Sequence, residues 1–156
     1  MKNQITPCLW FDNQAEEAAK YYTSIFKNSK IDNISYYTKE GFEIHGQKEG
    51  SVLTVAFRIN GQPFTALNGG PLFRFNESVS FQVFCETQDE IDFYWNNLTN
   101  GGEEGQCGWL KDKFGVSWQI VPAILPKLLG DPAKAGRVTN AFLQMKKFDI
   151  GLLKQA

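Results

Sequence analysis

An internal repeat is the feature that most constrains this chain. Segments 12–26 and 87–98 both place apolar residues at helical spacing. A strand-like run precedes each of them at the same shift of 73 residues, 5–11 before the first helix and 78–85 before the second. A repeated strand and helix predict two similar modules, each built as one supersecondary unit.

Each predicted module ends in a hairpin with glycine in its turn, Gly61 in the first and Gly115 in the second. Glycine supplies the positive φ that such turns need. Aligning the two glycines pairs Thr65 with Gln119, a shift of only 54 residues. The first module therefore carries extra residues between helix and hairpin, and we expect the polar stretch 37–50 to form a surface loop or hairpin extension.

Candidate helix starts carry capping residues. Asp12 or Asn13 suits the N-cap of the first helix. Further along the chain, Asp131 is a suitable N-cap with Pro132 at the first helical position. An apolar stripe follows, comprising Val138, Ala141, Phe142 and Met145. We expect a C-terminal helix outside the repeat, packed either on the sheet or on a second subunit.

Length and apolar content predict one domain. With 156 residues, 42% of them apolar, the chain can bury about 70% of its unfolded surface in one core. We therefore expect a single α+β domain over 1–156 with two βαβββ modules. The first module covers about 3–70, the second about 77–123, and a C-terminal helical extension about 124–156.

Charge and cysteine content limit the partners and the compartment. The net charge is −1 and the sequence holds no long basic run, so neither nucleic acid nor a membrane surface is an expected partner. A secretory h-region and a run of about 18 apolar residues are both lacking. Three cysteines without CxxC spacing favour reduced thiols. We expect a cytoplasmic protein.

Four runs carry a family resemblance: TPCLWFDNQAEEAAKYYTSIFKNSKI, GGPLFRFNESVSFQVFCETQDEIDFYW, QCGWLKDKFGVSWQIVP and LQMKKFDIGLL. They resemble the PhnB-like branch, often described as 3-demethylubiquinone-9 3-methyltransferase, of the vicinal oxygen chelate superfamily. Glyoxalase, bleomycin-resistance proteins and extradiol dioxygenases share that superfamily. The resemblance implies a cupped sheet made of two βαβββ modules and a twofold homodimer.

The resemblance also implies where a metal would bind. Metal-dependent members take one ligand from the first and one from the last strand of each module. Carried to this chain, these positions are Pro7, Thr65, Ser80 (or Gln82 by a second alignment) and Gln119. None of these side chains is an imidazole or a carboxylate, and an open divalent site needs about three such ligands. We expect neither a metal ion nor another cofactor.

Strand alternation predicts the pocket. It sends Ser80, Gln82 and Phe84 to one face of their strand and Val83 and Cys85 to the other, which suits packing under helices. A lining of apolar groups with a few hydrogen-bonding groups is typical of a site for a small organic ligand; the alternative is a polar cluster that fills a closed cup. The predicted lining is Leu9, Phe11, Thr65, Leu67, Ser80, Gln82, Phe84, Trp109 and Gln119, and the same parity directs Ser117 and Val121 inward.

The other potentially reactive side chains are expected to have no catalytic role. His45 lies in the polar insertion, where we expect it to be exposed. Cys107 has no histidine close in sequence to act as its base, so an ordinary thiol is favoured over a nucleophile. Arg58 and Arg74 could clamp an anion, although solvated or paired guanidinium groups are commoner. No catalytic residue is assigned.

Three functional hypotheses remain. The first is a homodimeric module that binds a small organic molecule in a metal-free cup at the module or dimer interface. The second is a metal-independent enzyme acting on a small carbonyl-type substrate, for which no acid or base is identified. The third is an interaction protein that uses its C-terminal helix. Methyl transfer from S-adenosylmethionine is disfavoured, because the sequence lacks a glycine-rich turn after the first strand of a parallel sheet.

Overall fold

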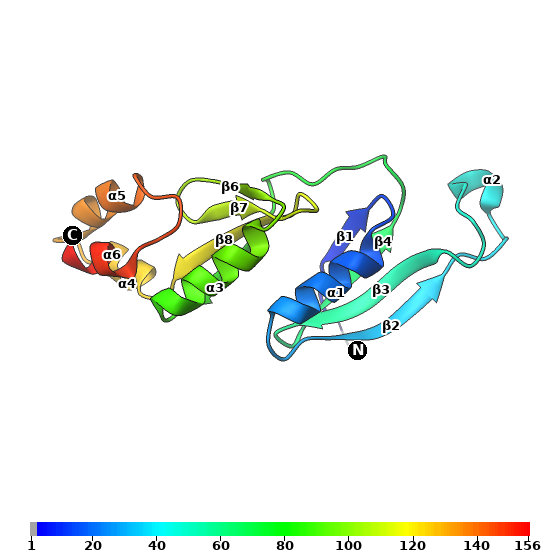
Figure 1. Ribbon diagram of the computed structural model, residues 1–156, viewed down its shortest axis with the longest axis horizontal. Helices are drawn as coiled ribbons and strands as arrows, with labels where there is room; N and C mark the ends of the chain where they lie inside the picture. Colours follow the sequence, from blue (N-terminus) through cyan, green and yellow to red (C-terminus); the bar gives the residue numbers. More distant parts are fainter. Residues whose placement is uncertain (1–2) are drawn as a thin grey trace. The chain divides into compact units, whose positions relative to one another are not determined.

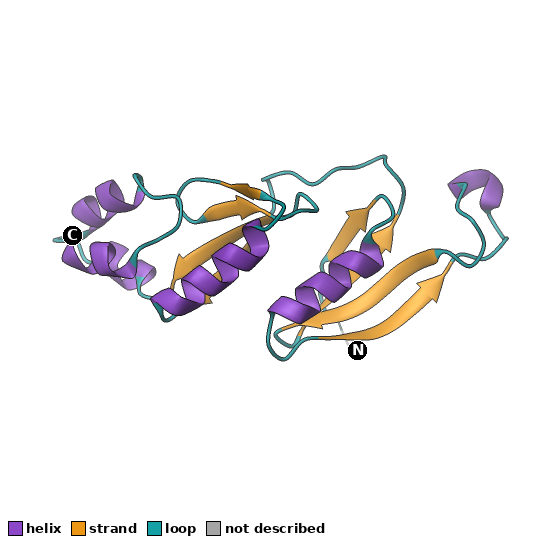
Figure 2. Ribbon diagram, viewed as in Figure 1, coloured by secondary structure: helices purple, strands orange, loops and turns teal. Residues whose placement is uncertain are grey.

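The structure, a computed structural model, describes residues 3–156 and divides the chain into two compact units with the boundary between Arg74 and Phe75 (Figure 1). Each unit contains one four-stranded mixed sheet with one long helix packed along it, and further short helices (Figure 2). No helix formed by residues 3–156 is long and apolar enough to cross a membrane. The expectation of a single domain over 1–156 stays a prediction.

The two units repeat one topology. The first comprises β1 (Cys8–Phe11), α1 (Ala15–Ile25), β2 (Lys30–Tyr36), α2 (Phe42–His45), β3 (Val52–Ile59) and β4 (Gln62–Asn68). The second comprises β5 (Phe81–Cys85), α3 (Gln88–Thr99), β6 (Glu103–Glu104), β7 (Trp109–Lys111) and β8 (Ser117–Pro122), followed by three short helices. The sheet orders are β1-β4-β3-β2 and β5-β8-β7-β6. In each sheet the first and last strands pair in parallel and the other pairs are antiparallel, so the predicted βαβββ modules are confirmed.

Helix α1 covers one face of the first sheet (Figure 1). Its buried stripe begins with Ala15, Ala18 and Ala19, whose small side chains let the helix approach the strands closely. Tyr22 then stacks on Phe57 of β3 with ring centroids 6.2 Å apart. These residues form the apolar core of the first unit, and the opposite face of the sheet takes no part in it.

The N-terminus of α1 is capped from a distant strand. Asp12 and Asn13, the predicted caps, both precede the N-cap residue Gln14, whose side chain makes no capping hydrogen bond. Instead the backbone N–H of Ala15 donates to Oδ1 of Asn68 at 2.8 Å. The predicted cap is wrong because a buried amide at the end of β4 satisfies the N–H group that a local cap would have taken.

Helix α3 is capped locally. Thr87 and Glu90 form a capping box, in which the Glu90 N–H donates to Thr87 Oγ1 at 3.2 Å and the Thr87 N–H donates to Glu90 Oε2 at 3.4 Å. Ile91, Trp95 and Leu98 are buried at helical spacing. The second helix therefore begins and packs as the sequence pattern predicts.

The C-terminal extension forms three short helices, α4 (Leu125–Leu129), α5 (Ala135–Phe142) and α6 (Ile150–Gln155), where the sequence predicted one. Helix α5 does not begin at Pro132. Asp131 Oδ1 accepts from the Ala133 N–H at 3.0 Å, so Asp131 stabilises a turn that delays the helix until Ala135.

This extension packs against the rest of the second unit, of which it is a part. The N–H groups of Cys107 and Gly108 donate to the carbonyl oxygens of Met145 and Lys146, both at 2.7 Å. Phe148, nearby in the chain, is almost fully buried. Of the two sequence alternatives, packing on the chain's own sheet unit is the one seen within residues 75–156.

Candidate functional site

Three polar side chains form a hydrogen-bonded ladder on one face of the second sheet. Gln82 of β5 lies directly opposite Gln119 of β8 in the parallel register. Gln82 Nε2 donates to Gln119 Oε1 at 3.3 Å, and Gln119 Nε2 donates to Ser80 Oγ at 2.8 Å. Both residues that sequence alignment offered for the first-strand position, Ser80 and Gln82, therefore contact the same partner.

Aromatic side chains flank this polar ladder. Phe84 follows it along β5 and is 55% exposed. Trp109 of β7 pairs with Gln119 in the antiparallel register and is half-buried. The adjacent residues Cys85 of β5 and Ile120 of β8 point to the opposite face and are buried. The predicted orientation of this part of the site agrees with the structure, while ligand binding there stays a prediction.

In the first sheet, Thr65 and Leu67 of β4 occupy the face opposite α1 and are half-buried. Leu9 and Phe11 do not share that face. They are 6% and 2% exposed and belong to the core under α1, so their predicted place in the pocket lining is wrong. Cys8 stands beside Thr65 instead, as the register of β1 and β4 requires.

The error arises from an offset of one residue. Cys8 pairs with Thr65, and Gln82 pairs with Gln119. Since Thr65 corresponds to Gln119, Cys8 must correspond to Gln82, a shift of 74 residues instead of the 73 that relates the helices. A slip of one residue moves every side chain of a strand to the other face.

Sequence reasoning also missed Trp10, which lies opposite Leu67 on the same face as Thr65. Its indole N–H donates to the carbonyl oxygen of Gly70 at 2.8 Å. A Cβ on Gly69 would come within 2.2 Å of the Trp10 ring, so only glycine permits this approach. The adjacent glycines after the last strand were the available signal, because consecutive glycines often mark a close contact.

The donors at the expected metal positions do not fit a divalent ion. Pro7 offers only its carbonyl oxygen, which accepts from the Thr65 N–H at 2.9 Å. The neighbouring side chains are the Thr65 hydroxyl, the Cys8 thiol and, in the second sheet, the two amides of the ladder. Within residues 3–156 no group of three or more His, Cys, Asp or Glu side chains could hold a metal. This donor set lacks the imidazole and carboxylate groups of an open catalytic site.

The three cysteines differ in environment. Burial raises the pKa of Cys85 to about 12, helped by the Glu90 carboxylate. Burial also raises the pKa of Cys8, although this residue is exposed on the surface. Cys107 is half-buried, and its Sγ lies 3.7 Å from the carbonyl oxygen of Phe142. A raised pKa lowers the thiolate fraction of Cys85 and of Cys8, which argues against either of them as a nucleophile.

His45 and Arg58 have structural partners. His45 is half-buried, not exposed as predicted, because its ring contacts Tyr37 with centroids 4.7 Å apart. Its Nδ1 accepts from the backbone N–H of Gln47 at 2.9 Å. Arg58 Nε is 2.8 Å from Asp32 Oδ2, the ion-paired alternative that the sequence allowed.

A buried carboxylate, Asp112, organises the turn between β7 and β8. Its Oδ1 accepts from the N–H groups of Phe114 and Val116, and its Oδ2 accepts from the Trp118 indole at 2.8 Å. Sequence reasoning did not single it out. Its position just before the Gly115 turn was the only local signal, and its role is to hold the hairpin.

Comparison with known proteins places this geometry in context. A family model described as 3-demethylubiquinone-9 3-methyltransferase matches residues 3–121. A solved structure described as a putative 3-demethylubiquinone-9 3-methyltransferase, PhnB protein, from Bacillus cereus is 38% identical. It covers 78% of this chain and 100% of its own, with a TM-score of 0.68. A search among curated proteins found no match.

More distant structures share the fold alone. Protein PA1353 from Pseudomonas aeruginosa is 17% identical, covers 76% of this chain and 96% of its own, and gives a TM-score of 0.59. The fosfomycin resistance protein FosX from Mesorhizobium loti is 12% identical, with coverages of 84% and 99% and a TM-score of 0.56. These matches extend the paired-module fold to proteins of very different sequence.

Proposed function

The chain belongs to the 3-demethylubiquinone-9 3-methyltransferase family, and we propose that it binds a small organic molecule on the open face of its second sheet without a metal ion. The observation that carries the proposal is the polar ladder of Ser80, Gln82 and Gln119, flanked by Phe84 and Trp109. Small-molecule sites combine apolar walls with a few placed polar groups, as this face does.

The ladder can still form hydrogen bonds with a ligand. Each glutamine amide offers two N–H donors and a carbonyl oxygen with two lone pairs. The two hydrogen bonds within the ladder use one N–H of Gln82, and one N–H and one lone pair of Gln119. The remaining donors and acceptors suit a neutral ligand that carries both kinds of group, such as an amide, a phenol or a carbonyl compound.

The apolar part of the face supports a ligand with an apolar or aromatic portion. Phe84 exposes more than half of its surface, and Trp109 presents an indole beside Gln119. Aromatic rings stack on planar ligands and bury a large area for few degrees of freedom. We extend the proposal to a homodimer in which a second copy shields this face, as the family resemblance implies.

Methyl transfer is not part of the proposal. A methyltransferase that uses S-adenosylmethionine typically has a parallel sheet with a glycine-rich turn after its first strand, whereas both sheets of this chain are mixed. The metal-dependent alternative is disfavoured by the donor set described above. An interaction role for the C-terminal helices is weakened because their segment already packs on the second unit.

Native mass spectrometry with elemental analysis tests the proposal. In protein purified without added metal, elemental analysis should find metal well below one equivalent per chain. Native mass spectrometry should detect a dimer that retains a small organic molecule. Near-stoichiometric zinc, nickel, manganese or iron would contradict the metal-free site. A dimer without any retained molecule would move the test to a ligand screen by thermal shift.

A matched pair of variants locates the site. Gln119→Leu removes the central member of the ladder while keeping a side chain of similar size, so the retained molecule should be lost or its affinity reduced by about tenfold or more. Gln155→Leu, on an exposed position of α6, serves as the control and should bind like the parent. Equal retention by both variants would show that the ligand binds elsewhere.

A further inference from the structure

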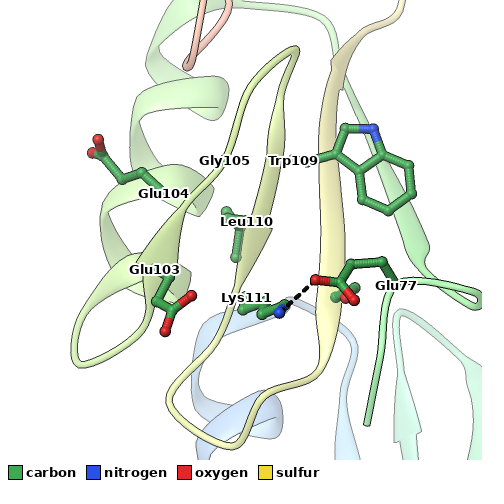
Figure 3. Close-up of a pocket in the computed structure, with 8 residues that line it drawn as sticks. Glu77, Glu103, Glu104, Gly105, Trp109, Leu110 and Lys111 are labelled. Carbon is green, nitrogen blue, oxygen red and sulfur yellow. Dashed lines mark ion pairs between the residues drawn. The ribbon is translucent and has the colours of Figure 1, made fainter.

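A pocket lies beside this face, at the edge of the second sheet, with a volume of about 170 Å³. A cavity of about 150 Å³ can hold benzene, so there is room for a ligand of about six non-hydrogen atoms. The pocket shares only Trp109 with the site proposed above. Its lining residues are Glu77, Glu103, Glu104, Gly105, Trp109, Leu110, Lys111 and Ser117 (Figure 3).

Ser117 gives this pocket an unsatisfied polar group. Its side chain is 1% exposed, and its Oγ is the one buried side-chain nitrogen or oxygen within residues 3–156 that lacks a hydrogen-bond partner. A buried hydroxyl without a partner is unfavourable, because it has lost its hydrogen bonds to water. A ligand that donates a hydrogen bond to Oγ would therefore gain more here than at a solvated hydroxyl.

The charges around the pocket favour a cation. The lining contains three carboxylates, those of Glu77, Glu103 and Glu104, and one ammonium group, that of Lys111. Glu104 has further partners, since it accepts from the Trp95 indole at 3.0 Å and lies 3.6 Å from Lys146 Nζ. Two carboxylates then face a single lysine, which leaves an excess of negative charge at the mouth of the pocket.

Lys111 is the resident cation of this pocket. Its Nζ lies 2.5 Å from Glu77 Oε1, and Figure 3 shows the two side chains pointing toward each other. The hydrogen bond to Glu77 and the charges of Glu77 and Glu103 raise the pKa of Lys111. The side chains of Lys111 and Glu77 are 36% and 60% exposed, and exposed ion pairs of this kind are weak. Another ammonium group can therefore compete with Lys111 for these carboxylates.

We propose that this pocket is a binding site for small organic ammonium ions. The ligand's ammonium group lies between the Glu77 and Glu103 carboxylates and donates a hydrogen bond to Ser117 Oγ. Its hydrocarbon part contacts Leu110 and the Trp109 ring, whose face also attracts cations. The inference does not depend on what the polar ladder binds.

Three probes of similar size test the charge preference. The ¹⁵N-labelled full-length protein is titrated with n-butylammonium chloride, 1-butanol and sodium butyrate at about 20 mM salt, where screening is weak. Butylammonium should shift the backbone amide signals of Lys111 and Ser117 and the indole signal of Trp109, and bind at least about tenfold more tightly than 1-butanol. Butyrate should leave these signals unchanged. Equal binding of the alcohol, or preferred binding of butyrate, would overturn the proposal.

Variants separate this site from the polar ladder. Ser117→Ala should weaken butylammonium binding at least about fivefold. Glu103→Gln, at an exposed position of the edge strand β6, should do the same and serves as the test if Ser117→Ala fails to fold. Lys111→Met keeps the aliphatic stem, removes the competing cation and should tighten binding severalfold. Gln119→Leu should change the affinity for butylammonium by less than about twofold relative to the parent protein. The two proposals can therefore fail independently of each other. Unchanged binding in Glu103→Gln together with weaker binding in Lys111→Met would refute the site.

Discussion

The two modules share one topology but carry different groups on the open faces of their sheets. In the first, β1 and β4 present Cys8 beside Thr65 and Trp10 beside Leu67. In the second, the strand pair equivalent to these presents two glutamine amides that bond to each other. The scaffold is thus common to both modules, while the potential for recognition lies in a few side chains of the first and last strands.

The modules also differ in how their buried polar groups are used. Asn68 in the first module caps a helix that begins 53 residues earlier in the chain. Asp112 in the second module organises a turn within a few residues of itself. Of these two buried groups, Asn68 makes a long-range contact and Asp112 makes local ones, and substitutions at the two positions test this difference.

Thiol alkylation should give the largest contrast. Cys8 is exposed on the open face of the first sheet, whereas Cys85 lies in the core of the second, where burial raises its pKa to about 12. Thiolates are the reactive species, so iodoacetamide at about pH 8 should modify Cys8 at least about a thousandfold faster than Cys85. Peptide mass spectrometry over time measures both rates. Similar rates in the folded protein would mean that the register of β1 is wrong.

That register was one part of the fold that the sequence could not define. Alternation within a strand sets which residues share a face, but not which face points to the helix. The number of residues between strand and helix decides which face of the strand points to the helix. The linker between β1 and α1 is one residue longer than the linker between β5 and α3. The first helix of each module, both hairpin turns and the surface insertion were predictable because each depends on a local pattern, with glycine or helical spacing as its signal.

Contacts between distant residues account for most of what was missed in the site. The Asn68 cap and the Trp10 contact with Gly70 join residues 53 and 60 positions apart, which no local pattern reports. The polar ladder was found because three polar residues interrupt otherwise apolar strands. The ammonium pocket was not, since its essential feature is the absence of a partner for Ser117, which is visible only in three dimensions.

Among substitutions, Asp112→Ala should cost the most stability. It leaves the N–H groups of Phe114, Val116 and the Trp118 indole without their acceptor in a buried turn. We expect the free energy of unfolding to fall by about 4 kcal/mol in urea denaturation followed by tryptophan fluorescence. Asp12→Ala, at an exposed position, is the control and should change it by less than about 0.5 kcal/mol. A small effect of Asp112→Ala would show that this turn is solvated.

Asn68→Ala should have the next largest effect, in the first module. The substitution removes the acceptor for the Ala15 N–H and the donor to the Val52 carbonyl oxygen, which lies 3.0 Å from Asn68 Nδ2. We expect a loss of about 2 kcal/mol, with the α1 amides losing protection in hydrogen exchange. Asn13→Ala is the matched control, because Asn13 is the cap that the sequence suggested. A larger loss of stability in Asn13→Ala than in Asn68→Ala would show that α1 is capped locally after all.

Thr87→Ala should have the smallest effect, because it removes one acceptor from a partly solvated helix start. The Glu90 N–H can turn to water, so the cost should be about 1 kcal/mol, and Thr87→Ser, which keeps the hydroxyl, should recover most of it. Gln14→Ala changes the equivalent N-cap position of α1 and should cost almost nothing, since its side chain caps nothing there. Equal effects at Thr87 and Gln14 in thermal denaturation would remove the distinction between a locally capped and a remotely capped helix. A clear difference, together with the loss expected for Asn68→Ala, would locate the cap of α1 at Asn68. The same helix in two related modules would then depend on a neighbouring residue in one and on a distant strand in the other.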